Sequence, residues 1–208
     1  MSFQALQALA GGLSTDRSGP VPIAQQPHLS QQSPSLALRC AAKADAGEIE
    51  RLVRDSGVLD VNSLYAYLLL CDHFGQTCLV AERASGEPGA ADGLAGFLTS
   101  YLPPAKPGVA FVWQVGVADW ARKQGLAKRL LGRLIGLPEL AETRYLETTI
   151  TDSNLASRRL FTSFAEQIGA SVRNDTGYTT ADLGGEHEAE KLYRIGPLPA
   201  DRSPFKEL

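Results

Sequence analysis

The stretch from Phe111 to Ile135 constrains the fold more than any other part of this chain. Residues 111–117 are β-branched or aromatic apart from Gln114 and Gly116, a pattern that predicts a buried strand. Hydrophobic residues then recur at helical spacing and predict an amphipathic helix: Leu126, Leu130, Leu131, Leu134 and Ile135. An isolated glycine in a strand is typical of a bulge or of a close backbone approach by a ligand, so we expect one of these at Gly116.

The turn between this strand and this helix, residues 122–127, has the composition of an anion site. A strand, a glycine-containing turn and a helix start together present free backbone N–H groups to phosphate. Gly125 and Ala127 leave room for a pyrophosphate near the backbone, while Arg122 and Lys123 add positive charge. The turn lacks the G-x-x-x-x-G-K-[ST] and G-x-G-x-x-G patterns, which argues against a P-loop and a dinucleotide fingerprint. A plain turn before a surface helix is the alternative.

Composition limits the class of protein and of partner. The chain has 208 residues, 44% of them hydrophobic, which is enough for one sizeable core. A net charge of −3 without any Lys/Arg run argues against nucleic acid or an anionic membrane as partner. Three cysteines without C-x-x-C spacing indicate neither a disulfide framework nor a zinc site, and we expect no metal. Lacking a long apolar run and a signal-peptide pattern, the chain is expected to be cytoplasmic.

The order of predicted elements indicates a single α/β (α+β) domain. Residues 1–34, rich in Gln, Ser, Pro, Gly and Ala, predict a flexible tail before a domain over 35–199 and a short C-terminal tail over 200–208. Strands are expected at 36–40, 77–82, 93–101, 111–117, 144–150, 171–174 and 191–195. This order predicts a mixed central sheet with helices on both faces.

Four helices are expected between these strands. The first covers 44–55, and the third is the helix from Leu126 to Ile135. The second begins after a cap at Asn62 or Ser63, and its expected apolar face is Leu64, Tyr65, Leu68 and Leu69. The fourth begins after a cap at Asp152 or Ser153, and its expected buried stripe is Leu160, Phe161, Phe164 and Ile168.

Two segments resemble the Gcn5-related N-acetyltransferase superfamily and imply its fold. Arg122, Gly125 and Ala127 match the R/Q-x-x-G-x-G/A turn, which in that family holds the pyrophosphate of coenzyme A. Asn154 begins a segment that resembles the N-x-x-A-x-x-x-Y pattern of the family. Phe161 stands where relatives often have the Tyr that protonates the departing thiolate, so the usual acid is missing there. The alternative role for Asn154 is a helix cap.

This resemblance implies acetyl-CoA as co-substrate and locates its binding site. In the family, the strand before the turn pairs with the pantetheine arm, and the asparagine of the later helix lies near it. The cofactor-binding residues so implied are Val115, Gly116, Val117, Arg122, Lys123, Gln124, Gly125, Ala127, Lys128, Asn154 and Ser157.

Five separated stretches between Leu36 and Pro197 resemble, more narrowly, the L-2,4-diaminobutyrate acetyltransferases of the ectoine pathway. They are residues 57–70, 111–115, 145–149, 153–161 and 187–197. Those enzymes acetylate the side-chain (N4) amine of diaminobutyrate on the way to ectoine, a compatible solute of osmotic stress, are typically homodimers and need no metal. The substrate-binding residues so implied are Asp60, Asn62, Tyr65, Trp113, Gln114, Glu147 and Glu190. The candidate catalytic residues are Tyr65, Glu147 and His187.

Several of these residues also have an ordinary structural alternative. Asp60 is equally consistent with a helix-entry residue, Glu147 with a solvated strand position and Glu190 with an acidic turn. Trp113, on a central strand, is equally consistent with the core, and His187 with the surface.

The chemistry of amine acetylation fits these residue types. An alkyl amine with a pKa like that of lysine, about 10.4, is unprotonated in only about one molecule in 10³ at neutral pH, at a cost near 5 kcal/mol. A carboxylate or imidazole in a water-poor pocket can accept that proton, and backbone N–H groups near Gly116 would polarise the thioester carbonyl. No Ser-His-Asp or Cys-His pattern is evident, which favours direct transfer in a ternary complex. The rival hypotheses are an acetyltransferase for ornithine, lysine or a polyamine, and a non-catalytic acyl-CoA-binding module.

Overall fold

A seven-stranded mixed sheet forms the centre of the computed structural model, which describes residues 35–57, 59–84 and 93–205. The predicted tail at 1–34 lies outside the described residues. The strands are β1 (Leu36–Cys40), β2 (Leu79–Arg83), β3 (Gly96–Tyr101), β4 (Val109–Val117), β5 (Tyr145–Thr151), β6 (Ser171–Tyr178) and β7 (Glu190–Gly196). Their order is β1-β2-β3-β4-β5-β7-β6, in which β4 and β5 are parallel and the other neighbours are antiparallel.

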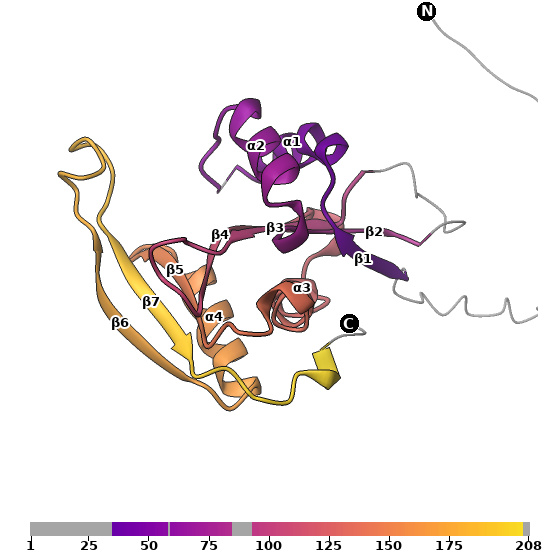
Figure 1. Cartoon of the computed structure of the whole chain (residues 1–208). Helices are drawn as coiled ribbons and strands as arrows, with labels where there is room; N and C mark the ends of the chain where they lie inside the picture. The colour runs from indigo at the N-terminus through magenta and orange to yellow at the C-terminus, as the bar shows by residue number, and fades with distance from the viewer. Residues whose placement is uncertain (1–34, 58, 85–92, 206–208) are drawn as a thin grey trace, which may run out of the picture. The chain divides into compact units, whose positions relative to one another are not determined.

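Helices cover both faces of the sheet, as the order of predicted elements indicated (Figure 1). The helices α1 (Ala46–Ser56) and α2 (Leu64–His73) lie on one face, and α3 (Leu126–Ile135) and α4 (Leu155–Gln167) on the other. Short 3₁₀ turns occur at Lys43–Asp45, Gly75–Thr77, Asp119–Ala121, Pro138–Leu140 and Ser203–Phe205. The predicted mixed sheet flanked by helices is therefore confirmed. None of the described helices is both long and apolar enough to cross a bilayer.

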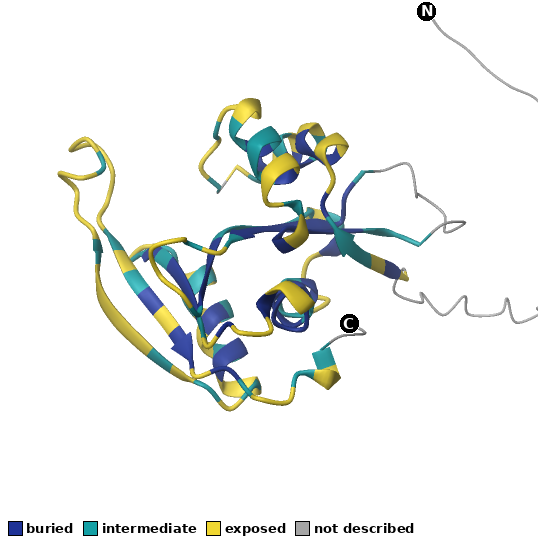
Figure 2. Cartoon of the chain, viewed as in Figure 1, coloured by how far each residue is buried: buried dark blue, intermediate teal, exposed yellow. Residues whose placement is uncertain are grey.

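The hydrophobic stripes read from the sequence form the larger core cluster, under α3 and α4. Leu130 and Leu134 of α3 are fully buried, and Phe161 and Phe164 of α4 join the same cluster. The inward surfaces of both helices are accordingly dark in Figure 2, whereas the loop between β6 and β7 is exposed. These two helices are thus anchored by burial, which fixes where their N-terminal ends lie.

The buried face of α2 differs from the predicted one. Tyr67 and Cys71, spaced by one helical turn, are buried against the sheet, whereas Leu64 and Tyr65 are 46% and 67% exposed. The segment from Leu64 to Cys71 is apolar all round, so its periodicity cannot select a face. Packing against the sheet determines which face of α2 is buried.

The irregularity predicted at Gly116 lies three residues earlier. Thr99 pairs with Gln114 and Ser100 with Val112, so Trp113 is the extra residue of a bulge in β4. Gly116 itself pairs regularly with Phe97. A Cβ at Gly116 would come within 2.3 Å of the Phe97 ring. The packing of Phe97 therefore requires a glycine at this position, without any ligand.

Strands β4 and β5 separate after a short parallel ladder. They pair only from Val109 with Tyr145 to Phe111 with Glu147. Beyond this point β4 pairs with β3 alone and β5 with β7 alone, so the facing edge of β4 has no strand partner. Strand β6 is longer than the predicted 171–174 and forms with β7 a hairpin that projects from the domain (Figure 1). The divergence of β4 and β5 leaves a groove between the two strands.

Residues Arg202 and Phe205, near the end of the described part, pack against the domain. Arg202 donates hydrogen bonds to the backbone carbonyls of Leu140 and Thr143, and Phe205 contacts the larger core cluster. Both residues belong to the segment 200–208 that the composition marks as a short tail, and the boundary at 199 stays a prediction.

Candidate active site

A groove of about 1320 Å³, here called the main groove, opens where β4 and β5 diverge. One wall is the free edge of β4, and the opposite wall is the end of β5 with the start of α4. The loop before α2 and the β6–β7 loop close its other sides. Four segments distant in sequence therefore meet at one site.

The turn before α3 brings a helix N-terminus to this groove. Gly125 adopts a left-handed conformation with φ of +74° as the N-cap of α3, and Lys123 is also left-handed at +62°. The first helical hydrogen bond runs from Arg129 N to Gly125 O at 3.1 Å. The N–H groups of the first turn of α3 therefore have no acceptor within the helix and carry the positive end of its dipole. Arg122 lines the groove beside them.

Most of the predicted cofactor-binding residues line the main groove. Those that do are Val115, Gly116, Val117, Arg122, Ala127, Asn154 and Ser157. Lys123, Gln124, Gly125 and Lys128 are outside the lining. Gln124 donates through Nε2 to the carbonyl of Trp120, and Lys128 donates through Nζ to the carbonyl of Ser163 at 3.4 Å. The side chains of Gln124 and Lys128 therefore bind backbone carbonyls of the protein and do not face the groove.

Asn154 is both a cap and a groove residue. Its Oδ1 accepts a hydrogen bond from Ser157 N at 3.0 Å, which makes Asn154 the N-cap of α4. The predicted cap at Asp152 or Ser153 is therefore wrong by one or two residues. The role of Asn154 as a cap is therefore observed, and because the residue also lines the groove, its role at the coenzyme A site stays a prediction.

The side of the groove away from the α3 turn is acidic. Asp60, Glu188 and Glu190 line it together with Asn62 and His187. The hydroxyl of Thr149 hydrogen-bonds to Glu190. Arg122, from the turn before α3, is the single arginine or lysine among the described lining residues. The charged residues thus divide by element: Arg122, which pairs with Asp119 at 2.9 Å, lies at the α3 turn, and the carboxylates lie at the hairpin and the loop before α2.

A hydrogen-bond chain that the sequence did not reveal holds the loop before α2. The Tyr67 hydroxyl donates to Gln114 Oε1 at 3.1 Å, and Gln114 Nε2 donates to the carbonyl of Asp60 at 2.9 Å. Trp113 packs on Tyr67 with ring centroids 5.9 Å apart. Gln114 and Trp113, predicted to touch substrate, therefore support the loop that carries Asp60 and Asn62.

Glu147 lies at the point where β4 and β5 part, outside the groove lining. Its side chain is 0% exposed and accepts hydrogen bonds from Lys106 Nζ at 2.8 Å and Arg194 Nε at 2.7 Å. Burial raises the pKa of this carboxyl, but the hydrogen bonds from Lys106 and Arg194 outweigh it and hold the pKa below its ordinary value. The carboxylate is thus held ionised. Tyr65, the other predicted catalytic residue outside the lining, is exposed on α2.

Several lining residues were absent from the sequence-based prediction. Glu188 accepts hydrogen bonds from Ser153, and Thr151 and Leu183 also face the groove. Glu188 lies between the predicted residues His187 and Glu190, so the acidic run itself was the available signal. Thr151 and Leu183 carry no local signal, because only the pairing of β5 with β7 brings them together.

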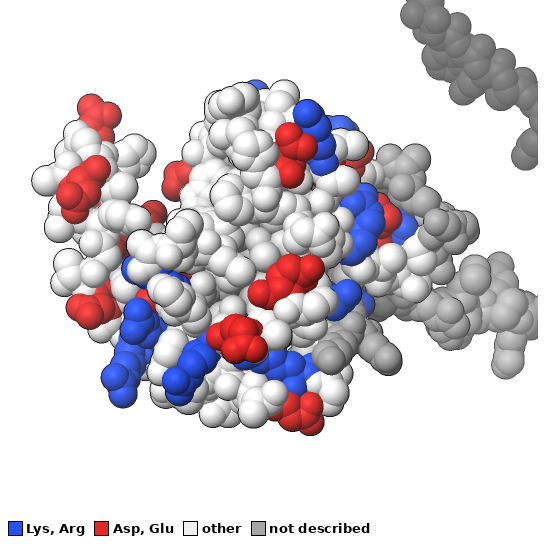
Figure 3. Space-filling model, in the orientation of Figure 1, with Lys and Arg blue, Asp and Glu red and all other residues white. Residues whose placement is uncertain are grey.

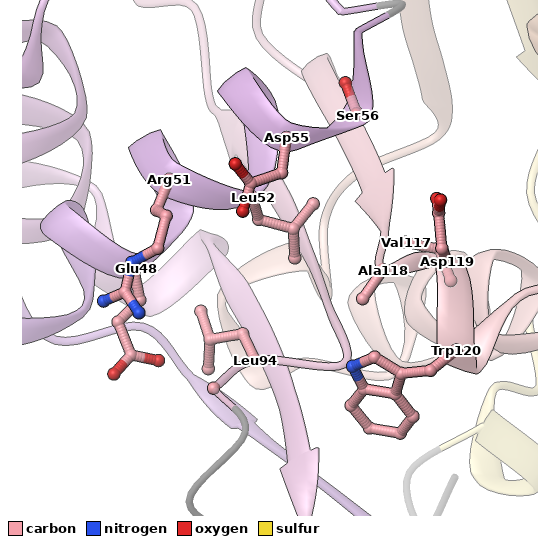
Figure 4. A pocket seen from close by; sticks show the side chains of 11 residues that line it. Glu48, Arg51, Leu52, Asp55, Ser56, Leu94, Val117, Ala118, Asp119 and Trp120 are labelled. Atoms are coloured by element: carbon pink, nitrogen blue, oxygen red, sulfur yellow. The ribbon is translucent and has the colours of Figure 1, made fainter.

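A second cavity, of about 270 Å³, lies between α1 and the end of β4 (Figure 4). Charged side chains of α1, including Arg51 and Asp55, face Asp119 and Trp120 across it. Val117 is the only predicted site residue in its described lining. The main groove is therefore the candidate site. Within the described residues, no three His, Cys, Asp or Glu side chains are grouped to hold a metal ion.

Comparisons with known proteins agree with this geometry. The model of the acetyltransferase (GNAT) family matches residues 48–165. An L-2,4-diaminobutyric acid acetyltransferase of Bordetella parapertussis is 41% identical over 83% of this chain and 92% of the relative. The chain belongs to the acetyltransferase (GNAT) family. The predicted superfamily, the narrower resemblance and the fold class are thereby confirmed.

Further relatives agree in sequence and in structure. The L-2,4-diaminobutyric acid acetyltransferase of Streptomyces coelicolor is 45% identical over 76% of this chain and 90% of the relative. Diaminobutyrate acetyltransferase EctA from Paenibacillus lautus, solved with L-2,4-diaminobutyric acid and coenzyme A, superposes with a TM-score of 0.71. It is 37% identical and covers 81% of this chain and 98% of its own.

Proposed function

We propose that this protein transfers the acetyl group of acetyl-CoA to the N4 amine of L-2,4-diaminobutyrate. The observation that carries the proposal is the division of charge in the main groove, in a chain of this family. A basic, N–H-rich turn suits the pyrophosphate of the co-substrate, and an acidic wall suits a diamino acid that is cationic at neutral pH. A non-catalytic acyl-CoA-binding module would have no use for that acidic wall.

The coenzyme A side would be held mainly by backbone. The first turn of α3 with Arg122 would hold the pyrophosphate. The unpaired edge of β4 at Val115 to Val117 offers backbone groups to the pantetheine arm and to the thioester carbonyl. Asn154 and Ser157 form the opposite wall.

Direct transfer from thioester to amine is the proposed route. Burial raises the pKa of Cys71 to about 11 and that of Cys78 to about 12, so neither thiol is a ready nucleophile, and neither lines the groove. The incoming amine must lose a proton as it attacks, and His187, Asp60 and Glu190 lie in the groove to accept it directly or through water. Glu147, ionised by two cations, is better suited to organising the junction of β4 and β5 than to accepting a proton.

We also propose that the protein acts as a homodimer in the cytoplasm. Apolar side chains of the loop before α2 and of α2 itself are exposed beside the groove: Val61, Leu64 and Tyr65. Such a patch is suited to burial against a second copy. The buried free thiols Cys71 and Cys78 suit a reducing compartment. Sedimentation equilibrium would give the oligomeric state, and a monomer at micromolar concentration would contradict the dimer.

The function is tested by acetylation assays on the purified full chain. Release of the coenzyme A thiol is followed with diaminobutyrate, ornithine, lysine and spermidine, and NMR of the product locates the acetyl group. Diaminobutyrate should exceed ornithine, which is one methylene longer, by at least about tenfold in kcat/KM. Initial rates are measured at varied concentrations of both substrates. The lines of their double-reciprocal plots should intersect, as a ternary complex requires. Parallel lines would indicate an acyl-enzyme, and a preference for another amine would replace the proposed substrate.

A further inference from the structure

The β6–β7 loop contributes to the main groove although little of it is buried. Leu183, His187 and Glu188 from this loop line the groove, yet residues 179–189 are exposed apart from partly exposed Leu183 (Figure 2). Acidic side chains lie along this projecting hairpin (Figure 3). An exposed loop of this kind has no hydrophobic core of its own to hold it. Its position must come from polar contacts.

The strongest such contact joins Glu188 to Ser153. One carboxylate oxygen of Glu188 accepts the backbone N–H of Ser153 at 3.1 Å, and the other accepts its hydroxyl at 2.5 Å. The Thr151 hydroxyl lies 3.2 Å from Ser153 Oγ. Because Ser153 gives its hydroxyl proton to Glu188, Thr151 is the donor in that pair. The carboxylate is therefore the end point of a short, directed chain of hydrogen bonds.

The contact lies just beyond the last strand pair. The ladder between β5 and β7 ends at Thr151 and Glu190. Glu188 and Ser153 are each two residues beyond that pair, so the side chain continues an attachment that the backbone has ended. Lys191 and Asp152 also pair at 2.7 Å, but both side chains are about half exposed and such ion pairs contribute little. The negative charge of Glu188 near the start of α4 is favoured by the dipole of that helix.

We propose that Glu188 is a positioning residue, which fastens the β6–β7 loop to the start of α4 and so holds His187 and Leu183 at the groove. This inference rests on the proposed acetyl transfer and assigns Glu188 a role in placing the acceptor amine. The carboxylate acts through Ser153 and does not touch the reacting atoms. The start of α4 is fixed independently by its own cap, Asn154, and by the burial of Phe161 and Phe164. Loss of Glu188 therefore releases the loop and leaves the coenzyme A wall in place.

A double-mutant cycle tests this role in the full chain. Glu188→Ala should lower kcat/KM for diaminobutyrate by about tenfold and change the Kd of coenzyme A by less than twofold. Ser153→Ala should cost less, because the backbone N–H of residue 153 still donates. In the background of Glu188→Ala, Ser153→Ala should have almost no further effect, since the two act through one contact. Multiplying effects would show that Glu188 and Ser153 act independently, which would overturn the inference.

Two variants sharpen the comparison. Glu188→Gln keeps an oxygen for the Ser153 N–H and should restore at least half of the activity lost in Glu188→Ala. Glu186→Ala removes an exposed carboxylate of the same loop and should leave kcat/KM unchanged. If Glu186→Ala is as harmful as Glu188→Ala, the effect comes from loop charge, and the fastening role is wrong.

A readout without catalysis separates this inference from the proposed function. Hydrogen exchange of the unliganded protein should be at least threefold faster at amides 180–189 in Glu188→Ala than in the wild type, with α3 and α4 unchanged. Equal exchange would overturn the fastening role, whatever the substrate. Faster exchange in a protein that fails to acetylate diaminobutyrate would retain the fastening and reject only the proposed function. Exchange raised across the whole domain would show general unfolding, which would likewise reject a local role.

Discussion

Gly125 shows how one residue can be required by both backbone and ligand. Its φ of +74° disfavours most side chains, yet a Cβ there would meet nothing within 4 Å. Asn and Asp both tolerate this conformation and have nearly the same shape, so they separate charge from strain. Gly125→Asp should weaken coenzyme A binding at least about tenfold relative to Gly125→Asn, because its carboxylate faces a pyrophosphate at a helix N-terminus. Calorimetry measures this ratio, and equal affinities would remove the turn from the site.

Tyr65 is the candidate donor of the proton that returns to the thiolate. Phe161, at the position where relatives often have Tyr, is buried in the core and has no hydroxyl to give. If Tyr65 supplies the proton instead, Tyr65→Phe should lower kcat about 10²-fold with little change in KM for acetyl-CoA. Tyr178→Phe, another exposed tyrosine, is the matched control and should have no effect. Full kcat with a raised KM for diaminobutyrate would make Tyr65 a pocket wall.

At the scale of elements, the ion pairs of Glu147 connect β5, β7 and the loop before β4. Glu147→Gln should lower the free energy of unfolding by about 2 kcal/mol at pH 7, less than for a fully buried pair because Lys106 and Arg194 are 48% and 44% exposed. Glu82→Gln, in a pair with Arg39 whose side chains are both about 40% exposed, is the control and should cost less than about 1 kcal/mol.

The pH dependence of the Glu147 effect follows from its lowered pKa. Unfolding restores the carboxyl to its ordinary pKa of 4.5, so the stability that it contributes is complete above that pH. It is lost as the pH falls through the lower pKa of the folded state. The stability difference between wild type and Glu147→Gln should therefore be constant from pH 7 to about 5 and shrink below 4.5, as urea titrations would measure. A difference that grows in acid would contradict the ion-pair account.

At the scale of the whole molecule, the sheet and both core clusters lie within the described residues after position 34. The low content of large apolar residues in 1–34 predicts that this segment adds little to folding. Deleting it should change the melting temperature by less than about 2 °C and leave kcat nearly unchanged. A larger loss of either, measured beside the full chain, would show that 1–34 packs on the domain.

Elements with a local sequence pattern could be predicted without the structure. The apolar stripes of α3 and α4 and the turn from Arg122 to Ala127 needed only helical spacing, a glycine and nearby charge. Most of the predicted coenzyme A residues follow from these local patterns, which is why so many of them line the groove.

Features that depend on partners distant in sequence could not be predicted, because the packing of the folded chain sets them. Helix α2 is apolar on all sides, and its packing against the sheet buries the face that carries Tyr67. Gly116 is required by the ring of Phe97, on another strand. Glu147 pairs with two cations, and Glu188 accepts hydrogen bonds from Ser153; these partners are about 35 to 47 residues away in the sequence. Spacing in one segment cannot specify which side chain of another segment will face it, because strand register and the divergence of β4 from β5 are set by the packing of the whole sheet.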